Sequence, residues 1–461
     1  MAGLFGTLSI AISGLAVSQQ QMETSSNNVA NANTKGYSRE VVETEAGAPI
    51  VISGLTVGTG VVLDKIESLR DPILEIQLNQ ATQQQSSLNA QLAQLQTLQT
   101  HFAGSTSGIG ADISNFFNSL EQLSPDPSSV ELRQSVLTAA TNLATDFRST
   151  ASSLTTQEGN LNLIVQQSVD EVNSLTAEIA SVGQQIAQLQ NAHQDASTLI
   201  DQQTNLIRQL SGFVDVQVIQ TGNGGINLAT ANGTALVTGT QSFALTTKTG
   251  SDGNSHIFAG NQDITSSLTG GSLAGTVQVR DQEIPGILNQ LDQLATGFAN
   301  AVNAANAQGF DLNGHAGGNI FTPPPAGGTG AAATLQVGIT DPSLIAASSD
   351  GTAGSNGNLT NLLAVATQPV AGGQTPINAY SNLVFQVGNT TSDTSADADA
   401  AGEILQQLQN QRGSISGVSL DEEAASIVQF QTAYQASARV ITTINGLLAD
   451  AVNLGIESAM Q

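Results

Sequence analysis

The 461-residue sequence contains no cysteine and no tryptophan, and only 3% of its residues are aromatic. The absence of cysteine excludes disulfide bonds, thiolate catalysis and cysteine-ligated metal sites. With so few aromatic residues, we do not expect a ligand cleft lined by aromatic rings. Four scattered histidines leave little for a histidine-based site. We therefore expect no enzyme, no bound metal and no cofactor.

Basic residues are also scarce, because 11 lysines and arginines stand against 37 acidic residues, for a net charge of −26. A chain this acidic will not bind nucleic acid through counterion release, and anionic membranes repel it. Without any run of 18 apolar residues, membrane insertion is not expected. The first basic residue is Lys35. The N-terminus therefore lacks the basic region of a cleaved signal peptide, and an amphipathic helix is expected there.

Both ends of the sequence place apolar and small residues at alternating steps of four and three, the pattern of an amphipathic helix with one buried seam. At the N-terminus the pattern occupies positions 4 to 29 and ends in the turn-forming residues 31–36. At the C-terminus it runs from Ile427 to Ala451, after a capping box formed by Ser419 and Glu422. An isolated helix of this kind is marginal. The two seams therefore need each other or neighbouring copies.

The middle of the chain is mostly helical. Asp71 and Pro72 predict a helix start, and Ser128 with Glu131 forms a second capping box. The helix that follows, about 60 residues ending near Gln190, would span about 90 Å. Three further helices are expected over residues 284–308, 376–387 and 398–411.

Two regions between the helices read as extended chain. Residues 37–67 contain short β-branched runs separated by glycine and proline. From Phe213 to about residue 280 the period changes to two, and Asn232–Gly233 predicts a hairpin turn. A further short strand is expected at residues 335–339.

These elements predict an α+β protein, an elongated multidomain chain. Its N- and C-terminal helices pair as a coiled coil, beside a helical rod domain and a small inserted β-domain. The expected segments are a terminal helix with an extended linker, the first part of the rod, the β insert, the second part of the rod with Gly/Pro-rich β segments, and the C-terminal helix: residues 1–70, 71–211, 212–282, 283–418 and 419–461.

Two acidic motifs are weighed as sites and rejected. Residues 311–314 (DLNG) lack the acidic spacing and terminal glutamate of a calcium loop, so a turn is expected. The acidic triplet at 421–423 lies in the first turn of the C-terminal helix. Acids at this position normally interact with the helix dipole rather than act in catalysis.

Four separated motifs carry a resemblance to a known family. Residues 27–39 (NNVANANTKGYSR) resemble the N-terminal signature of bacterial flagellar axial proteins, the rod, hook and hook-associated proteins, although Lys35 stands where proline is common. Residues 168–173 (SVDEVN), 307–314 (AQGFDLNG) and 413–438 follow in the order found in the hook-associated branch. The resemblance covers both ends and most helical segments, and is weakest over 220–280 and 315–375.

The resemblance implies a non-enzymatic structural subunit of the extracellular flagellum, placed between hook and filament. It implies export through the flagellar type III apparatus without cleavage, followed by assembly into a ring or short helical layer. The implied partners are further copies of the chain, the hook protein, hook-associated protein 3 and a cytosolic export chaperone at the C-terminal helix.

The expected assembly interface combines the two seams with the turn between them. Its residues are Leu4, Leu8, Ile12, Leu15, Met22, Asn31, Asn33, Thr34, Gly36, Tyr37, Ile427, Phe430, Tyr434, Ile441, Ile444 and Leu448.

Two alternatives remain open from the sequence. One is another axial protein, such as hook or rod, although the long helix after Ser128 disfavours a chain that is mostly β between its ends. The other is a secreted surface adhesin whose β insert binds a ligand.

Overall fold

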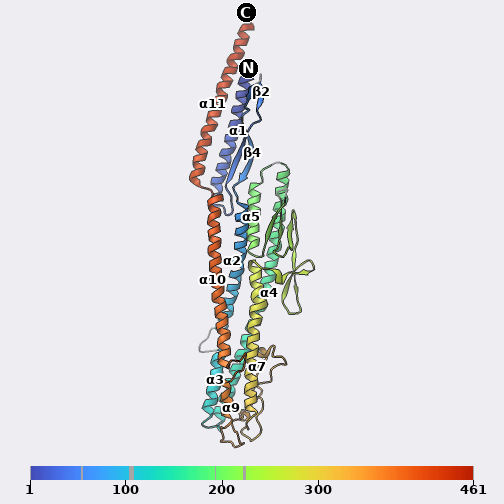
Figure 1. Ribbon diagram of the computed structural model, residues 1–461, viewed down its shortest axis with the longest axis vertical. Helices are drawn as coiled ribbons and strands as arrows, with labels where there is room; N and C mark the ends of the chain where they lie inside the picture. The colour runs from blue at the N-terminus through green and yellow to red at the C-terminus, as the bar shows by residue number, and fades with distance from the viewer. Residues whose placement is uncertain (1, 53–54, 103–107, 193, 222–224, 460–461) are drawn as a thin grey trace. The chain divides into compact units, whose positions relative to one another are not determined.

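The computed structural model describes residues 2–52, 55–102, 108–192, 194–221 and 225–459 (Figure 1). These residues are mostly helical, with small antiparallel sheets, as the sequence predicted. The chain divides into two compact units, and each is built from several separate stretches of sequence. Unit 1 contains residues 1–82, 172–244 and 402–461, and unit 2 contains residues 83–171 and 245–401.

Three long helices contribute residues to both units. They are α2 (Pro72–Thr100), α4 (Val130–Asn191) and α10 (Pro376–Ser416).

Unit 1 holds both ends of the chain. Its complete helices are α1 (Ala2–Asn31), α5 (Ser197–Ser211) and α11 (Leu420–Ala459). Two ribbons follow α1: β1 (Glu40–Ala46) pairs antiparallel with β4 (Val61–Ser68), and β2 (Ile50–Ile52) pairs with β3 (Leu55–Val57). The remaining strands form one four-stranded antiparallel sheet: β5 (Gln217–Gln220), β6 (Ile226–Ala229), β7 (Ala235–Thr238) and β8 (Gln241–Ser242).

Unit 2 is a helical core with a small three-stranded sheet of β9 (Leu245–Thr249), β10 (Ser255–Ala259) and β11 (Gln262–Asp263). Its helices include α3 (Ile109–Leu123), α6 (Gly271–Gln278), α7 (Ile284–Asn306), α8 (Ala331–Thr334) and α9 (Leu359–Ala364). A π turn (Val279–Glu283) joins α6 to α7, and three 3-10 turns complete the unit: Thr265–Ser267, Pro342–Leu344 and Val365–Thr367.

The core of unit 2 is formed by the apolar sides of its helices. In unit 2, Phe116 and Phe117 of α3 pack edge-to-face against Phe298 of α7, with ring centroids 5.6 and 6.0 Å apart. Buried residues of α4 recur at helical spacing, including Leu161, Val165 and Val172. Four phenylalanines, Phe116, Phe147, Phe298 and Phe321, are fully buried in this core.

Several local predictions are confirmed. Asp71 caps α2, because its Oδ1 accepts from the backbone N–H groups of Ile73 and Leu74. The hairpin at Asn232–Gly233 joins β6 to β7, and Gly233 has the positive φ that this turn needs. The long helix is continuous over 62 residues.

Four local predictions are wrong. Ser129, not Ser128, caps α4, because its Oγ accepts from Leu132 N–H while the Ser128 hydroxyl bonds Asp126. The predicted helices at 376–387 and 398–411 are one helix, α10. Residues 335–339 form only an isolated bridge, between Val337 and Phe321. The strands end at Asp263, and α6 occupies a stretch whose short apolar residues do not distinguish a buried helix from a strand.

None of the described helices combines the length and apolar character that crossing a bilayer requires.

Candidate assembly interface

The terminal helices α1 and α11 pack along each other and run in opposite directions, so both chain ends lie at the same end of the pair (Figure 1). The helices approach closely at Gly14, where an added Cβ would lie 3.3 Å from Ser437 Oγ. The buried positions of α1 are mostly small or polar: Ala11, Val17, Ser18, Thr24, Ser25 and Asn28. Pairing within one chain therefore uses the small residues of α1.

Most of the large seam residues predicted from the sequence are only partly covered in a single chain. On α1, Leu4, Leu8, Leu15 and Met22 are half-buried, and Ile12 is exposed. On α11, Ile444 is buried, whereas the other five are half-buried: Ile427, Phe430, Tyr434, Ile441 and Leu448. The pair therefore presents a partly uncovered apolar surface.

The turn after α1 is held by its own residues. Thr34 N–H donates to the carbonyl of Asn31, and the Thr34 hydroxyl donates to the Asn31 side chain at 3.1 Å. Gly36 follows with φ 88°, a conformation that glycine adopts without steric cost. Asn33 is exposed. This geometry turns the chain back so that β1 runs beside α1.

Asn28 fixes the start of β1 to α1. Its carboxamide donates to the carbonyl of Glu40 at 2.8 Å and accepts from the N–H of Glu40 at 2.9 Å. The Tyr37 hydroxyl also donates to Asn28 Oδ1, at 2.8 Å. Asn28 is only 1% exposed. One side chain thus replaces a neighbouring strand at the first residue of β1.

Charged residues from three other segments converge on the same turn. The guanidinium of Arg39 bonds Glu423 at 2.6 Å and Glu422 at 3.0 Å, which ties the turn to the first turn of α11. The backbone N–H of Ser38 donates to the carboxylate of Asp201 in α5 at 2.9 Å. Arg70 lies 3.1 Å from the same carboxylate.

Arg412 of α10 completes the arrangement. Its guanidinium donates to the Gly36 carbonyl at 2.9 Å and to the Ser38 hydroxyl at 3.2 Å. It also bonds Glu75 at 2.7 Å, and Arg208 bonds the other oxygen of that carboxylate. Of the eight arginines in the sequence, Arg39 lies in the turn and Arg412 bonds it directly. Arg70 and Arg208 bond the carboxylates of Asp201 and Glu75, which contact Ser38 and Arg412. We call Asn28, Ser38, Arg39, Glu40, Asp201 and Arg412 the turn cluster.

Burial dominates the electrostatics of the turn cluster. It raises the pKa of Glu40, whose Oε1 has no hydrogen-bond partner among the described residues. It also raises the pKa of Asp201, against the opposing effect of the Arg70 charge. The pKa of the Tyr37 hydroxyl is raised by burial and then by the negative charge of Glu40. Burial is therefore the largest influence on the pKa values of Glu40, Asp201 and Tyr37.

Sequence reasoning identified part of this arrangement. Asn31, Thr34, Gly36 and Tyr37 lie in the turn, next to the end of α1. The turn cluster itself was not predicted. Asn28, Ser38 and Arg39 belong to the recognised motif, so the motif was an available signal for them. No local sequence pattern indicates that Glu40, Asp201 and Arg412 join this cluster.

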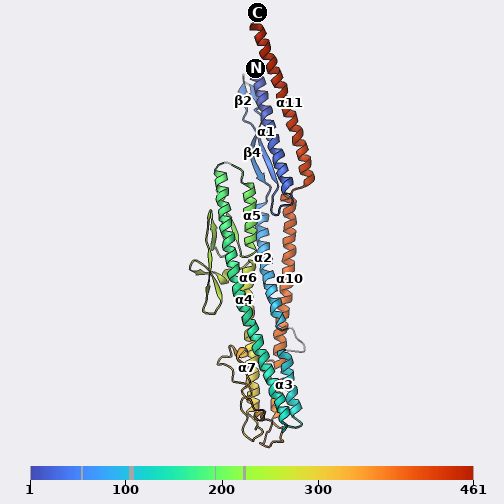
Figure 2. The same cartoon turned by 180° about the vertical axis from the view of Figure 1, so that it is seen from behind.

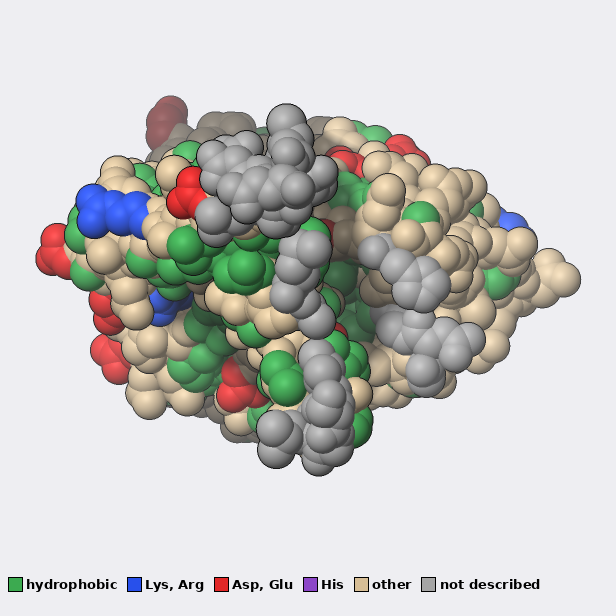
Figure 3. Space-filling model, turned by 90° about the horizontal axis from the view of Figure 1, so that it is seen from above, with side chains coloured by type: hydrophobic (Ala, Val, Ile, Leu, Met, Phe, Trp, Pro, Cys, Tyr) green, Lys and Arg blue, Asp and Glu red, His purple; other side chains and the backbone are tan. Residues whose placement is uncertain are grey.

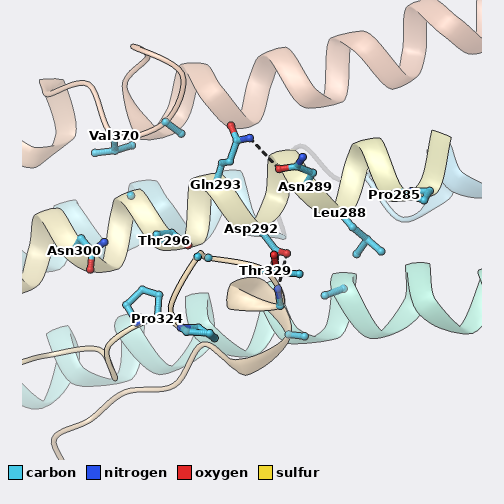
Figure 4. A pocket seen from close by; sticks show the side chains of 18 of the residues that line it. Pro285, Leu288, Asn289, Asp292, Gln293, Thr296, Asn300, Pro324, Thr329 and Val370 are labelled. Atoms are coloured by element: carbon cyan, nitrogen blue, oxygen red, sulfur yellow. Dashed lines mark hydrogen bonds between the residues drawn. The ribbon is translucent and has the colours of Figure 1, made fainter. Parts of the chain in front are cut away.

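A separate hollow of about 1050 Å³ lies in unit 2, between α7, the loop of Pro323–Gly330 and part of α4 (Figure 4). Its Asp292 accepts hydrogen bonds from the backbone N–H groups of Gly330 and Ala332, at 2.7 and 2.9 Å. Both oxygens of this carboxylate hold the loop. Across the described parts of the chain, no group of three or more His, Cys, Asp or Glu side chains is placed to hold a metal ion.

Three known families match the chain. The family described as "Flagellar hook-associated protein FlgK helical domain" matches residues 95–321. "Flagella basal body rod protein" matches residues 8–37, which include most of α1 and the turn. "Flagellar basal body rod FlgEFG protein C-terminal" matches residues 409–454, which include most of α11.

Full-length relatives are similar as well. Flagellar hook-associated protein 1 of Bacillus subtilis (strain 168) is 30% identical, with 98% of this chain and 99% of the relative covered. The protein of that name from Escherichia coli (strain K12) is 28% identical, with 96% and 98% covered. The solved structure of the flagellar hook junction protein FlgK from Burkholderia pseudomallei has the same fold. Its TM-score is 0.67 at 18% identity, with 74% of this chain and 100% of that chain covered.

These matches run through nearly the whole chain, and they do not favour an adhesin or a hook or rod subunit. They confirm the resemblance drawn from the four sequence motifs. The chain belongs to the flagellar hook-associated protein 1 family of structural flagellar proteins.

Proposed function

We propose that this chain assembles at the hook–filament junction by packing the uncovered seam of α1 and α11 against neighbouring copies. Membership of the family makes the chain a structural subunit of the bacterial flagellum. The observation that carries the proposal is the exposure of the seam. Of the six large residues predicted on α11, only Ile444 is buried in a single chain.

The surface argument extends beyond the seam. Phe5 and Ile12 of α1 are 56% and 51% exposed, and Val428 and Leu447 of α11 are 62% and 50% exposed. Hydrophobic side chains are also open on the face seen from above in Figure 3. An apolar surface of this kind on an acidic chain is typical of a protein–protein contact. Further copies of the chain are the first partners, since flagellar axial proteins self-assemble.

The remaining partners follow from the same surface. We propose contacts with the hook protein on one side and hook-associated protein 3 on the other. Before assembly, the apolar side of α11 needs a cover, and a cytosolic export chaperone would supply it. Export through the flagellar type III apparatus would then release the chain outside the cell, as a structural and not a catalytic component.

The proposal is tested by one substitution in the seam. Ile441→Asp puts a charge on the half-buried side of α11, and Gln435→Asp puts the same charge on an exposed position of the same helix. Each variant replaces the native chain in a motile strain, and attached filaments are counted by electron microscopy. We expect Ile441→Asp to lose its filaments and Gln435→Asp to keep them.

Two further measurements separate assembly from folding and export. Circular dichroism of the purified variants reports whether Ile441→Asp still folds, and immunoblots of the culture medium report whether it is exported. A folded, exported Ile441→Asp chain that supports a normal number of filaments would overturn the proposal.

A further inference from the structure

The hairpin of β2 and β3 exposes apolar side chains on both of its faces. Ile50 pairs with Val57 on one face, and Val51 stands on the other. All three are exposed, and Val51 reaches 71%. A two-stranded hairpin with no hydrophobic covering is marginally stable in water. The adjoining β1–β4 ribbon adds the exposed Val62 and Leu63.

This surface and α11 lie on different sides of α1. In both views of the ribbon diagram, α1 stands between α11 and the strands (Figures 1 and 2). Two contacts of α1 show which part of the strands and which part of α11 lie at the same height along α1. Ser13 Oγ accepts from Val61 N–H of β4 at 3.3 Å, and the next residue, Gly14, meets Ser437 of α11. The strands near Val61 and the α11 residues near Ser437 therefore share one level of unit 1.

At that level, the side of α11 carries a matching surface. Val440 and Leu447 are seven residues apart, so they lie on the same side of the helix. Both are exposed, 41% and 50% respectively. Arg439 is exposed beside them, and it is the only basic residue of α11.

The charges on the two surfaces are complementary. The β1–β4 ribbon carries Glu43, Glu45 and Asp64, and its single lysine, Lys65, pairs with Glu43 and Glu67. Within the part of the chain that the structure describes, neither Glu45 nor Arg439 has an ion-pair partner. In the register of the ribbon, Glu45 pairs with Val62, which is next to the Val61 that bonds Ser13.

We propose that the hairpin and the β1–β4 ribbon of one copy pack on the Val440–Leu447 side of α11 of a neighbouring copy, with Glu45 facing Arg439. The inference rests on the proposed function, because it names the surfaces through which copies meet. The two surfaces differ, so the contact is head-to-tail. Repeated from copy to copy, such a contact closes a ring or continues as a helical layer.

The absence of cysteine allows a direct test. A chain carrying both Glu45→Cys and Arg439→Cys is assembled into flagella in cells. The isolated flagella are treated with a bismaleimide long enough to bridge the Cα separation of a Glu–Arg ion pair, and the chains are separated by denaturing electrophoresis. Glutamate and arginine side chains are long enough to pair with their Cα atoms farther apart than the limit of about 7 Å for a disulfide, so a cross-linker is used in place of oxidation. We expect a ladder of covalent multimers. The matched control, Glu403→Cys with Arg439→Cys, joins an exposed α10 position and should give monomers.

Charge exchange provides the second measurement. Glu45→Arg and Arg439→Glu should each lower the number of attached filaments about tenfold, because each places like charges together. The double exchange restores the pair and should recover most of the filaments. Glu403→Arg controls for the change in net charge.

The outcomes separate this inference from the proposed function. Flagella that assemble with no ladder, or a double exchange no better than the single ones, overturn the head-to-tail contact. Loss of filaments in Ile441→Asp would then still support assembly through the terminal helices. Normal filaments in Ile441→Asp would overturn the proposed function itself.

Discussion

The side chain of Asn28 bonds both backbone groups of Glu40, donating to its carbonyl and accepting from its N–H. A carboxamide is the one neutral side chain that offers both an acceptor and a donor in the spacing of a strand neighbour. This pairing anchors the first strand of the molecule to its first helix. It gives a physical reason for an asparagine at this place in the flagellar motif.

Asn28→Ala should therefore weaken unit 1. The substitution leaves the buried N–H and C=O of Glu40 without their partner, at a cost of about 1–3 kcal/mol. Urea unfolding followed by circular dichroism measures the loss, since the chain has no tryptophan to report by fluorescence. Asn33→Ala, at an exposed position of the same motif, should change the free energy of unfolding by less than about 0.5 kcal/mol. Equal effects of the two changes would contradict the assigned role of Asn28.

The pH dependence of unit 1 should respond to Glu40. Burial raises the pKa of Glu40 above its ordinary value of 4.5, so the folded protein binds this proton more tightly than the unfolded chain does. The contribution of this group to stability is therefore greatest in acid, and it is lost as the pH rises through the raised pKa.

Glu40→Gln removes that titration. We expect its stability relative to the native chain to increase from mildly acidic to neutral pH. Glu43→Gln, at an exposed site of the same strand, serves as the control. Unfolding curves at several pH values provide the comparison, and a difference that is constant over this interval would show that Glu40 does not titrate as described.

The ion pair between Arg39 and Glu423 joins residues 384 positions apart. The carboxylate is almost fully buried and the guanidinium partly so. Arg39→Met leaves a buried charge unpaired and should cost about 2–4 kcal/mol, somewhat less than for a fully enclosed pair. The double variant Arg39→Met/Glu423→Met should regain part of this loss.

A matched change at Lys65, whose pairs with Glu43 and Glu67 are exposed, tests the role of burial. Lys65→Met should lose no more than about 1 kcal/mol. If Arg39→Met and Lys65→Met are equally mild, burial does not set the strength of the Arg39 pair.

Two glycines in the helices of unit 2 should respond oppositely to alanine. At Gly297 of α7 an added Cβ would lie 1.8 Å from the Val370 carbonyl, whereas at Gly159 of α4 nothing lies within 4 Å. Gly159→Ala should stabilise the protein by about 0.5–1 kcal/mol through helix propensity. Gly297→Ala should destabilise it, because backbone must move. The thermal unfolding midpoints of both variants test this prediction. If Gly297→Ala also stabilised the protein, the close contact between Gly297 and Val370 would be contradicted.

The elements that the sequence predicted are those with a strong local signal. The steps of four and three residues identified α1 and α11, and Asp71 marked the start of α2. The errors arose where local signals were weak. The two helices predicted at 376–387 and 398–411 are separated by Gly388 and polar residues, yet α10 continues through them. The five domain segments expected from composition stay a prediction.

The turn cluster could not be predicted from spacing. Asp201, Arg412 and Glu423 reach residues 36–40 from three distant helices, and no local pattern in the sequence marks those partnerships. The seam residues could be predicted as positions on one side of a helix, because burial of one side makes apolar residues recur at helical spacing in the sequence. Which of them are covered within one chain depends on how α1 and α11 approach each other, and the small residues of α1 determine that approach.

The partners of the Arg39 region also impose an order on events. The ribosome adds Arg39 long before Glu423, which lies 384 positions later in the sequence. Until Arg412 and Glu423 have been synthesised, the turn lacks its contacts to α10 and α11. A chain that ends before Arg412 therefore cannot form these contacts. The contacts that hold the turn after the first helix to α10 and α11 thus form only after most of the chain has been made.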